Sequence, residues 1–189
     1  DLIFVHGWGD LHDEMIAFTA KFFKESSAES ILLNGSAEYE LNLPGFKYWK
    51  EELEGKYSIP ANRILAIKPA SNTQIEALAL AAFMEERKIS EAIVLSVPQH
   101  IVRAFLTDLG VILEAGLTVR LHPKTLTRVN WFQAIVIRNL SMSNEHTTRL
   151  GRMAAEFARI AEYRRRFESG DEGFKIASVE EGLKHLQKL

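Results

Sequence analysis

Side chains able to do chemistry are most concentrated between Ser96 and Arg103, directly after an apolar run. Ala92–Leu95 is predicted to be a buried strand, because short apolar runs are typical of strands covered on both faces. The residues that follow supply a hydroxyl, an amide, an imidazole and a guanidinium, from Ser96, Gln99, His100 and Arg103. In a parallel α/β sheet, ligands bind at the carboxyl ends of the strands. The stretch therefore predicts where a site lies, but not its reaction.

His100 and Arg103 are expected to act together, because residues three apart lie on one face of a helix. Cations near a helix N-terminus are unfavourable unless an anion or carboxylate compensates them. A guanidinium forks onto phosphate or carboxylate oxygens, and imidazole has the unperturbed pKa nearest neutrality. We therefore expect Arg103 to bind an anionic group and His100 to be the general acid or base. Glu38 or Glu40 is expected to orient His100 or a water molecule.

Three other turns carry polar residues after predicted strands. They are His6-Gly7-Trp8-Gly9, Asn34-Gly35-Ser36 and Ser71-Asn72-Thr73. Glycine lets backbone amides approach a ligand closely, and the carboxyl ends of parallel strands share one edge of the sheet. His6 and His122 also follow strands and are further candidates for the same crevice. The expected ligand-binding residues are Gly7, Gly35, Ser36, Asn72, Thr73, Ser96 and Arg103.

Each of these clusters also has a structural interpretation. Ser71-x-x-Gln74 and Thr73-x-x-Glu76 both match a capping box. Ser96 could cap its helix, with Pro98 in the first turn, where a missing N–H costs nothing. On this interpretation the residues stabilise helix starts and bind no ligand.

The elements that must position these residues alternate between strand and helix. Strands are predicted at Leu2–Val5, Ser30–Leu33, Ile64–Ile67, Ala92–Ser96 and Leu117–Leu121, with amphipathic helices between them. This order predicts a Rossmann-like three-layer sandwich over residues 1–123, with a mostly parallel sheet of about five strands.

Residues 124–189 are predicted to form a mainly helical C-terminal extension. Within it, 131–140 is either a helix or a late strand, and 144–168 is one long helix with Leu150, Met153, Phe157 and Ile160 on its buried stripe. Ser178 and Glu181 form a capping box that opens a last helix. We expect the extension to pack on the core or to form a homodimer surface.

Composition narrows the function classes. A net charge of −2 gives no reason to expect nucleic acid or an anionic membrane as partner. No apolar run approaches the roughly 20 residues that span a bilayer, and no basic leader precedes the first strand, so a cytoplasmic location is expected. The chain has no cysteine, which excludes disulfides and thiol catalysis. It contains no P-loop, no dinucleotide fingerprint, no Gly-x-Ser-x-Gly elbow and no metal-ligand spacing.

Taken in order, these motifs resemble the bacterial domain-of-unknown-function 218 family of YdcF-, SanA- and ElyC-like proteins. The resemblance rests on the glycine turn after the first strand, Asn34-Gly35-Ser36, Ser71-Asn72-Thr73 and Ser96-x-x-x-His100-x-x-Arg103, and it covers residues 1–123. It implies a Rossmann-like sheet with a pocket at these turns, a link to cell-envelope processes, and a nucleotide-like or S-adenosylmethionine-like ligand.

The chain also departs from the family pattern. The acidic residue of the third motif falls one position late, at Glu76, so its family role is not carried over to that residue. The usual arginine after the first glycine turn is replaced by acidic residues, and we expect no membrane anchor of the kind that some relatives have. The leading hypothesis is an α/β domain that binds a phosphate-bearing or nucleotide-like small molecule, as a hydrolase or transferase if it is an enzyme. The alternative is a non-catalytic binding or assembly module that uses its helical C-terminal part.

Overall fold

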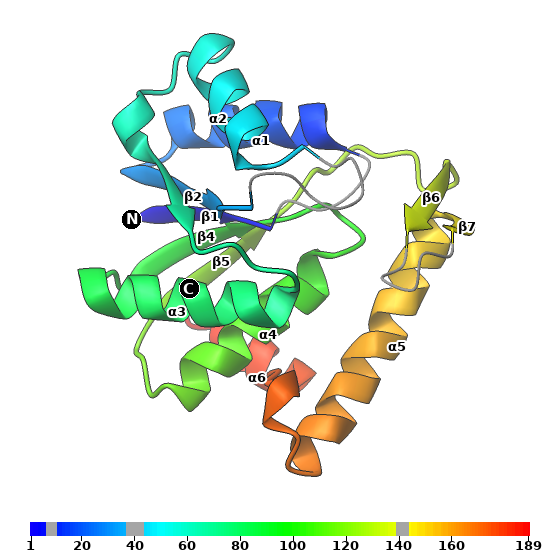
Figure 1. Ribbon diagram of the computed structural model, residues 1–189. Coiled ribbons are helices and arrows are strands. Elements are labelled where there is room, and N and C mark those ends of the chain that lie inside the picture. Colours follow the sequence, from blue (N-terminus) through cyan, green and yellow to red (C-terminus); the bar gives the residue numbers. More distant parts are fainter. Residues whose placement is uncertain (7–10, 37–43, 139–143) are drawn as a thin grey trace.

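A five-stranded parallel sheet forms the centre of the fold (Figure 1). The computed structural model describes residues 1–6, 11–36, 44–138 and 144–189. The strand order is β3-β2-β1-β4-β5, which confirms the predicted Rossmann-like α/β class. The strands are β1 (Leu2–Val5), β2 (Ser30–Asn34), β3 (Ile64–Ile67), β4 (Glu91–Leu95) and β5 (Arg120–Lys124).

Helices cover both faces of the sheet, giving the predicted three layers. On one face α1 (His12–Glu25) and α2 (Phe46–Gly55) pack against Ile3, Ile31 and Leu33 of the sheet. On the other face α3 (Thr73–Arg87) and α4 (Ile101–Glu114) pack against Phe4, Leu32 and Val94. Figure 1 shows the two pairs above and below the strands. Both faces of β1, β2 and β4 are largely buried, as their continuous apolar sequences predict.

The alternation of side chains along each strand fixes which layer the first polar residue faces. Phe4, Leu32 and Val94 are register partners that point toward α3 and α4. Two residues later in the chain come His6, Asn34 and Ser96, all buried. Because side chains two apart in a strand share a face, the sheet delivers all three to the α3–α4 side of its carboxyl edge.

From the fifth strand onward the structure differs from the prediction in part. The fifth strand is Arg120–Lys124 rather than 117–121, and of the two alternatives given for 131–140 the structure has the strand, β6 (Ala134–Arg138). β6 pairs antiparallel with β7 (Asn144–Thr148), so the predicted helix starts only at α5 (Arg149–Glu168). The hydroxyl of Thr148 accepts a hydrogen bond from the N–H of Gly151 and caps that helix.

The last elements return to the core. A short 3-10 turn (Glu172–Phe174) links α5 to α6 (Val179–Leu186), which begins with the predicted Ser178–Glu181 capping box. Ile176 and Ala177 are buried against α4, where a Cβ on Gly110 would stand 2.6 Å from the Ala177 nitrogen. Glycine at this position is therefore required by the close approach of the returning chain.

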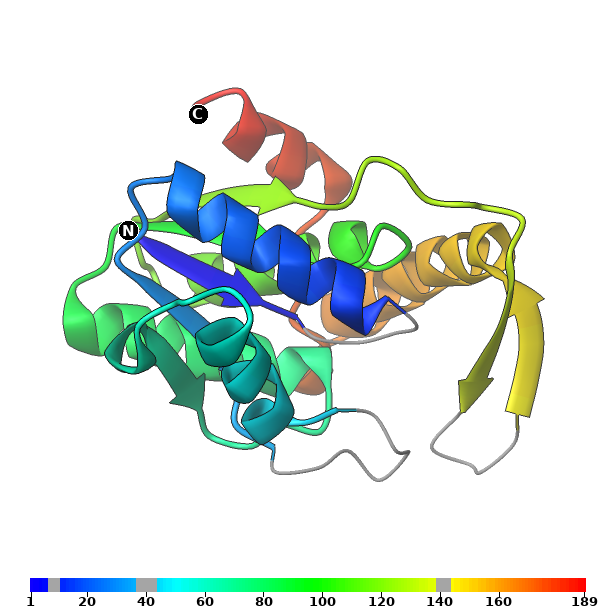
Figure 2. The same cartoon turned by 90° about the horizontal axis from the view of Figure 1, so that it is seen from above.

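Figure 1 and Figure 2 both show α5 beyond the carboxyl ends of the strands, with the β6–β7 hairpin at the start of the helix. Of the predicted α5 stripe, Ile160 is buried, whereas Leu150 and Phe157 are exposed. No helix within the described ranges is long and apolar enough to cross a membrane.

Candidate functional site

A buried histidine between two carboxylates forms the first polar network at the carboxyl edge. His6 Nδ1 lies 2.8 Å from Glu76 Oε2 of α3, and His6 Nε2 lies 2.8 Å from Asp108 Oδ2 of α4. All three side chains are fully buried. Burial alone would lower the pKa of His6, but Asp108 and Glu76 together raise it to about 10. His6 is therefore an imidazolium that donates one hydrogen bond to each carboxylate.

Asn34 extends this network to the loop before α3. Its Nδ2 donates to Glu76 Oε1 and to the carbonyl of Ala70, both at 2.8 Å, and its Oδ1 accepts from the N–H of Ala70. Burial raises the pKa of Glu76, yet the contacts of this carboxyl with His6 and Asn34 bring the pKa below its usual value. Burial outweighs His6 at Asp108 and raises the pKa of that carboxyl. The network joins β1, β2, α3 and α4, and its full burial fits a structural role.

A second network lies beside the first, around His100 at the start of α4. The rings of His6 and His100 are 6.2 Å apart, centre to centre. His100 Nε2 lies 3.3 Å from Thr73 Oγ1, and His100 Nδ1 lies 3.0 Å from Glu156 Oε2 of α5. Arg103 Nε also donates to Glu156 Oε2, and Arg103 Nη1 donates to Thr73 Oγ1 at 3.3 Å. We refer to Thr73, His100, Arg103 and Glu156 as the edge cluster.

The charges around Glu156 fix its ionisation. Arg152 Nη2 lies 3.0 Å and Arg159 Nη1 2.8 Å from Glu156 Oε1, while Arg103 contacts the other oxygen. Burial opposes ionisation of this carboxyl, but hydrogen bonds and charge from His100 and Arg103 hold its pKa far below the usual range. Glu156 is therefore a carboxylate that only accepts hydrogen bonds.

An ionised Glu156 also assigns the proton on His100. The Glu156 carboxylate, at 3.0 Å, is nearer to Nδ1 than Arg103 Nη2, at 3.3 Å, and therefore favours an N–H on Nδ1, so in the neutral ring Nε2 carries the lone pair and faces the Thr73 hydroxyl. Burial and the positive charge of Arg103 lower the pKa of His100 to about 4, against the raising effect of Glu156. His100 is thus neutral near pH 7, and its Nε2 can accept a proton.

The structure brings three of the predicted site residues together: Thr73, His100 and Arg103 all belong to the edge cluster. Asn72 is exposed and caps α3, because its Oδ1 accepts from the N–H of Ile75. Neither predicted capping box is the cap of this helix. Gly7, Glu38 and Glu40 lie outside the described residues. The described carboxylate that contacts His100 is Glu156.

Of the remaining predicted residues, Gly35, Ser36 and Ser96 lie beside the first network and His122 does not. Ser36 donates from Oγ to Asn34 Oδ1 at 2.9 Å, and Ser96 donates from Oγ to the carbonyl of His6 at 3.4 Å. A Cβ on Gly35 would stand 2.2 Å from the carbonyl oxygen of Ile67, so only glycine fits between these strand ends. His122 lies on β5, and its Nε2 is 2.7 Å from Oε1 of Glu91 on the neighbouring strand β4. This contact lies apart from the edge cluster.

The sequence-based prediction did not include Glu156 or Asp108 and did not assign Glu76 to the site. The sequence around the missed residues nevertheless contains a signal for them. Glu156 stands three residues after Met153 and four before Ile160, on the stripe predicted to be buried. Asp108 interrupts an apolar helix whose neighbouring positions are all buried. A carboxylate in such a position requires a cationic or hydrogen-bonding partner, and the partners here come from other elements.

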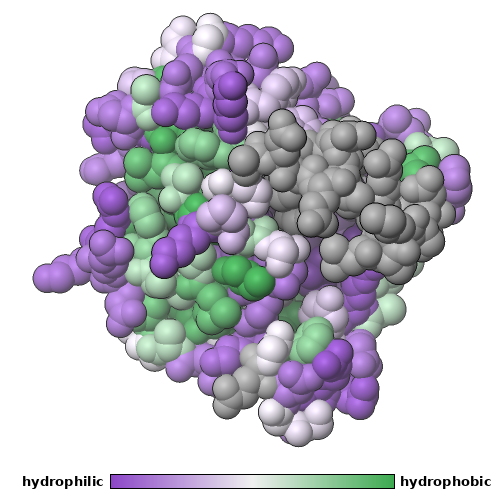
Figure 3. Space-filling view, viewed as in Figure 1, coloured by the Kyte–Doolittle hydropathy of each residue, from purple (hydrophilic) through white to green (hydrophobic). Residues whose placement is uncertain are grey.

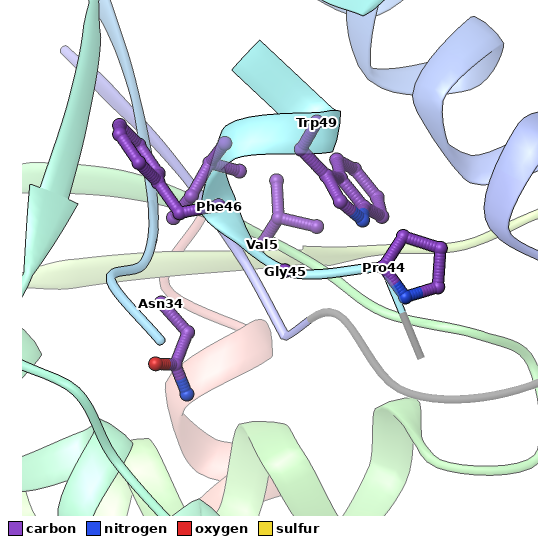
Figure 4. A pocket seen from close by; sticks show the side chains of 7 residues that line it. Val5, Asn34, Pro44, Gly45, Phe46 and Trp49 are labelled. Carbon is purple, nitrogen blue, oxygen red and sulfur yellow. The ribbon is translucent and has the colours of Figure 1, made fainter. Parts of the chain in front are cut away.

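A small, mostly apolar pocket lies at the same edge, between the ends of β1 and β2 and the start of α2 (Figure 4). Its lining residues are Val5, Leu33, Asn34, Pro44, Gly45, Phe46 and Trp49. Figure 4 shows Asn34 as the polar side chain among those labelled. This pocket therefore adds apolar surface beside the first network, whereas the buried guanidinium of Arg103 belongs to the edge cluster.

In the described part of the chain no three His, Asp or Glu side chains are arranged to hold a metal ion. The chain matches no protein-family model and no curated protein. The structure is a Rossmann-like α/β fold with two buried polar networks at the carboxyl edge of its sheet.

Proposed function

We propose that this protein binds a phosphate-bearing or nucleotide-like small molecule at the carboxyl edge of its sheet. Arg103 pairs with the anionic group, and His100 is the general acid or base. The observation that carries the proposal is the edge cluster itself, where a buried guanidinium, an imidazole and a hydroxyl meet at the edge that binds ligands in this fold.

The hydrogen bonds of Arg103 support an anion at this place. A guanidinium has five N–H donors. Glu156 takes the Nε–H, Thr73 takes one Nη1–H and Nη2 lies 3.3 Å from His100 Nδ1, so the second Nη1–H and an Nη2–H are the donors left for phosphate oxygens. Guanidinium groups also gather here, because Arg152 and Arg159 share the same carboxylate. Such a surplus of cations favours a small anion over a cationic or apolar ligand.

The resemblance to the domain-of-unknown-function 218 family supports the same class of ligand. Thr73, His100 and Arg103 belong to the motifs that carry the resemblance, and they are the three that meet in the edge cluster. The proposal therefore includes S-adenosylmethionine and nucleotides as ligands, but neither nucleic acid nor a membrane surface as partner.

Calorimetric titration with inorganic phosphate, adenosine monophosphate and S-adenosylmethionine tests the proposal. We expect Arg103→Ala to weaken binding of the phosphate-bearing ligands by roughly 10- to 100-fold, since a charged hydrogen bond contributes about 1.5–3 kcal/mol. Arg165→Ala is the matched control, because Arg165 lies exposed on α5 and pairs with Glu162 at the surface. A folded Arg103→Ala protein with undiminished affinity would refute the site.

One observation favours the alternative of an assembly module. Val179, Leu183 and Leu186 of α6 are exposed at helical spacing, so one apolar face of this helix is open to solvent. If the C-terminal part forms a homodimer, the sedimentation coefficient of the wild type rises with concentration and that of Leu183→Glu does not. A monomer at every concentration contradicts this alternative.

A further inference from the structure

A hydroxyl, an imidazole and a carboxylate stand in sequence within the edge cluster. Thr73 Oγ1 is 3.3 Å from His100 Nε2, and His100 Nδ1 is 3.0 Å from Glu156 Oε2. The three side chains come from the start of α3, the start of α4 and the middle of α5. This is the order of groups by which enzymes turn a hydroxyl into a nucleophile: hydroxyl, base, and a carboxylate that orients the base.

The direction of each hydrogen bond fits that use. Glu156 is ionised, so His100 carries its proton on Nδ1 and turns the Nε2 lone pair toward Thr73. The Thr73 hydroxyl then donates to Nε2, and it can transfer that proton when its oxygen attacks an electrophile. Glu156 holds the ring in this tautomer and stabilises the imidazolium that forms.

A role in capping α3 does not account for the Thr73 hydroxyl. Threonine at a helix start commonly accepts from a backbone N–H two or three residues on, but here Asn72 fills that position and caps α3. Thr73 is left to make its hydrogen bonds with His100 and Arg103. The Arg103 Nη1–H donated to Thr73 Oγ1 stabilises negative charge on that oxygen, as does the positive end of α3.

We propose that Thr73 is a nucleophile that accepts the phosphoryl group of a phosphomonoester, with His100 as its base and Glu156 as the residue that positions His100. This inference rests on the proposed function, which brings a phosphate to Arg103. Thr73, His100 and Arg103 are only 6%, 7% and 9% exposed. A terminal phosphoryl group can reach a hydroxyl buried to this degree more easily than the central phosphorus of a diester, so a monoester is the substrate class.

The reaction balances in two steps. Thr73 Oγ1 attacks phosphorus as the ester oxygen leaves, and the Thr73 proton passes through His100 Nε2 to that leaving oxygen, giving an alcohol and phosphothreonine. A water molecule then attacks the phosphorus, gives a proton to His100 Nε2, and Thr73 Oγ1 leaves with that proton. The products are the alcohol and inorganic phosphate, and Arg103 faces the phosphoryl oxygens in both steps.

The test uses p-nitrophenyl phosphate with four proteins: wild type, Thr73→Val, Thr73→Ser and Thr118→Val. We expect Thr73→Val to lower kcat by roughly a thousandfold or more, as loss of a triad member does. Thr73→Ser restores the hydroxyl and should retain activity. Thr118 is exposed outside the cluster, so Thr118→Val should match the wild type. In acid-quenched wild type, mass spectrometry should find one phosphoryl group on the peptide that contains Thr73.

The outcomes separate this inference from the proposed function, because phosphate binding is measured independently by calorimetry. Phosphate binding without p-nitrophenol release, or equal rates in wild type and Thr73→Val, overturns the nucleophile and leaves the binding site intact. Hydrolysis that needs Thr73 but gives no phosphothreonine also overturns it, because a water molecule that gives its proton to His100 is then the nucleophile that attacks phosphorus. Absence of phosphate binding overturns the proposed function itself. Urea midpoints of all four proteins show that each is folded.

Discussion

Raising the pH should destabilise this protein through His6, the imidazolium between Glu76 and Asp108. The ordinary pKa of histidine is 6.5, and these two carboxylates raise that of His6 to about 10 in the folded protein. One pKa unit corresponds to about 1.4 kcal/mol. The folded protein therefore holds this proton about 5 kcal/mol more tightly than the unfolded chain does.

The sign follows from which state binds the proton more tightly. Because the folded-state pKa is the higher one, the stabilisation is complete below pH 6.5 and is lost as the pH rises through about 10. Between these limits the folded state binds one more proton than the unfolded state. The free energy of unfolding should then fall by about 1.4 kcal/mol per pH unit, which is about 2–3 kcal/mol from about pH 7 to about pH 9.

Urea unfolding at constant ionic strength, at about pH 7, 8 and 9, measures this slope. The chain has no cysteine, so no thiol titrates in the window. Glu76→Gln is the informative variant. An amide at this place removes one of the two charges that raise the pKa of His6. The free energy of unfolding of this variant should therefore be lower than that of the wild type at about pH 7, and it should fall less steeply as the pH rises. Glu162→Gln, at an exposed carboxylate of α5, should keep the wild-type slope.

Two results would refute this reasoning. A free energy of unfolding that stays flat from about pH 7 to about pH 9 would show that His6 is not an imidazolium in the folded protein. A Glu76→Gln slope as steep as that of the wild type would show that the titrating group is not His6. Either result would mean that the buried contacts among Glu76, His6 and Asp108 do not depend on a charged His6.

Other predictions concern the C-terminal part and the edge cluster. Gly110→Ala should lower the free energy of unfolding by about 1–3 kcal/mol, because the added Cβ would overlap the backbone of Ile176 and Ala177, and urea unfolding measures this loss. Gly55→Ala is its control: nothing lies within 4 Å of the added Cβ, so the same assay should show no loss. Ser178→Ala removes the capping box of α6 and should lower the free energy of unfolding by about 1 kcal/mol, measured by circular dichroism in urea; an unchanged midpoint would contradict the cap. Glu156→Gln should lower kcat for p-nitrophenyl phosphate by roughly a hundredfold or more with KM little changed, and ¹⁵N spectra should show His100 losing its Nδ1–H preference. A wild-type kcat in that variant would mean that Glu156 does not position the base.

The sequence predicts the sheet well because its strands are short apolar runs that turns interrupt. The exception is β5, where Arg120, His122 and Pro123 replace the apolar pattern. An edge strand needs less apolar sequence, and proline is tolerated there because among the described strands β5 pairs only with β4. The β6–β7 hairpin could not be predicted either, since a short apolar run such as 134–138 fits a strand or a helix equally well.

Only part of the edge cluster can be predicted from local sequence pattern. Thr73, His100 and Arg103 each follow a strand, so parallel topology alone predicts that they meet. Glu156 follows no strand, and it reaches Arg103 from 53 residues away only because of how α5 packs. Periodicity predicts that the Glu156 position is buried, but it does not say which cation lies opposite. The same is true of Asp108 and Glu76. Periodicity does not reveal that their partner is His6, which β1 positions.

The attachment of α5 at both ends has a consequence for how the site works. At its start, the N–H of Leu150 bonds to the carbonyl of Trp131, and beyond its end the N–H of Ala177 bonds to the carbonyl of Leu106. A helix tied at two points confines the Glu156 carboxylate to a small volume, which amounts to a high effective concentration beside His100. The entropy of placing that carboxylate is thus lost once, when the chain folds, and not at each encounter with a ligand. A backbone cut between α5 and α6 would release one tie, so Glu156 would meet His100 less often although every side chain of the site remained.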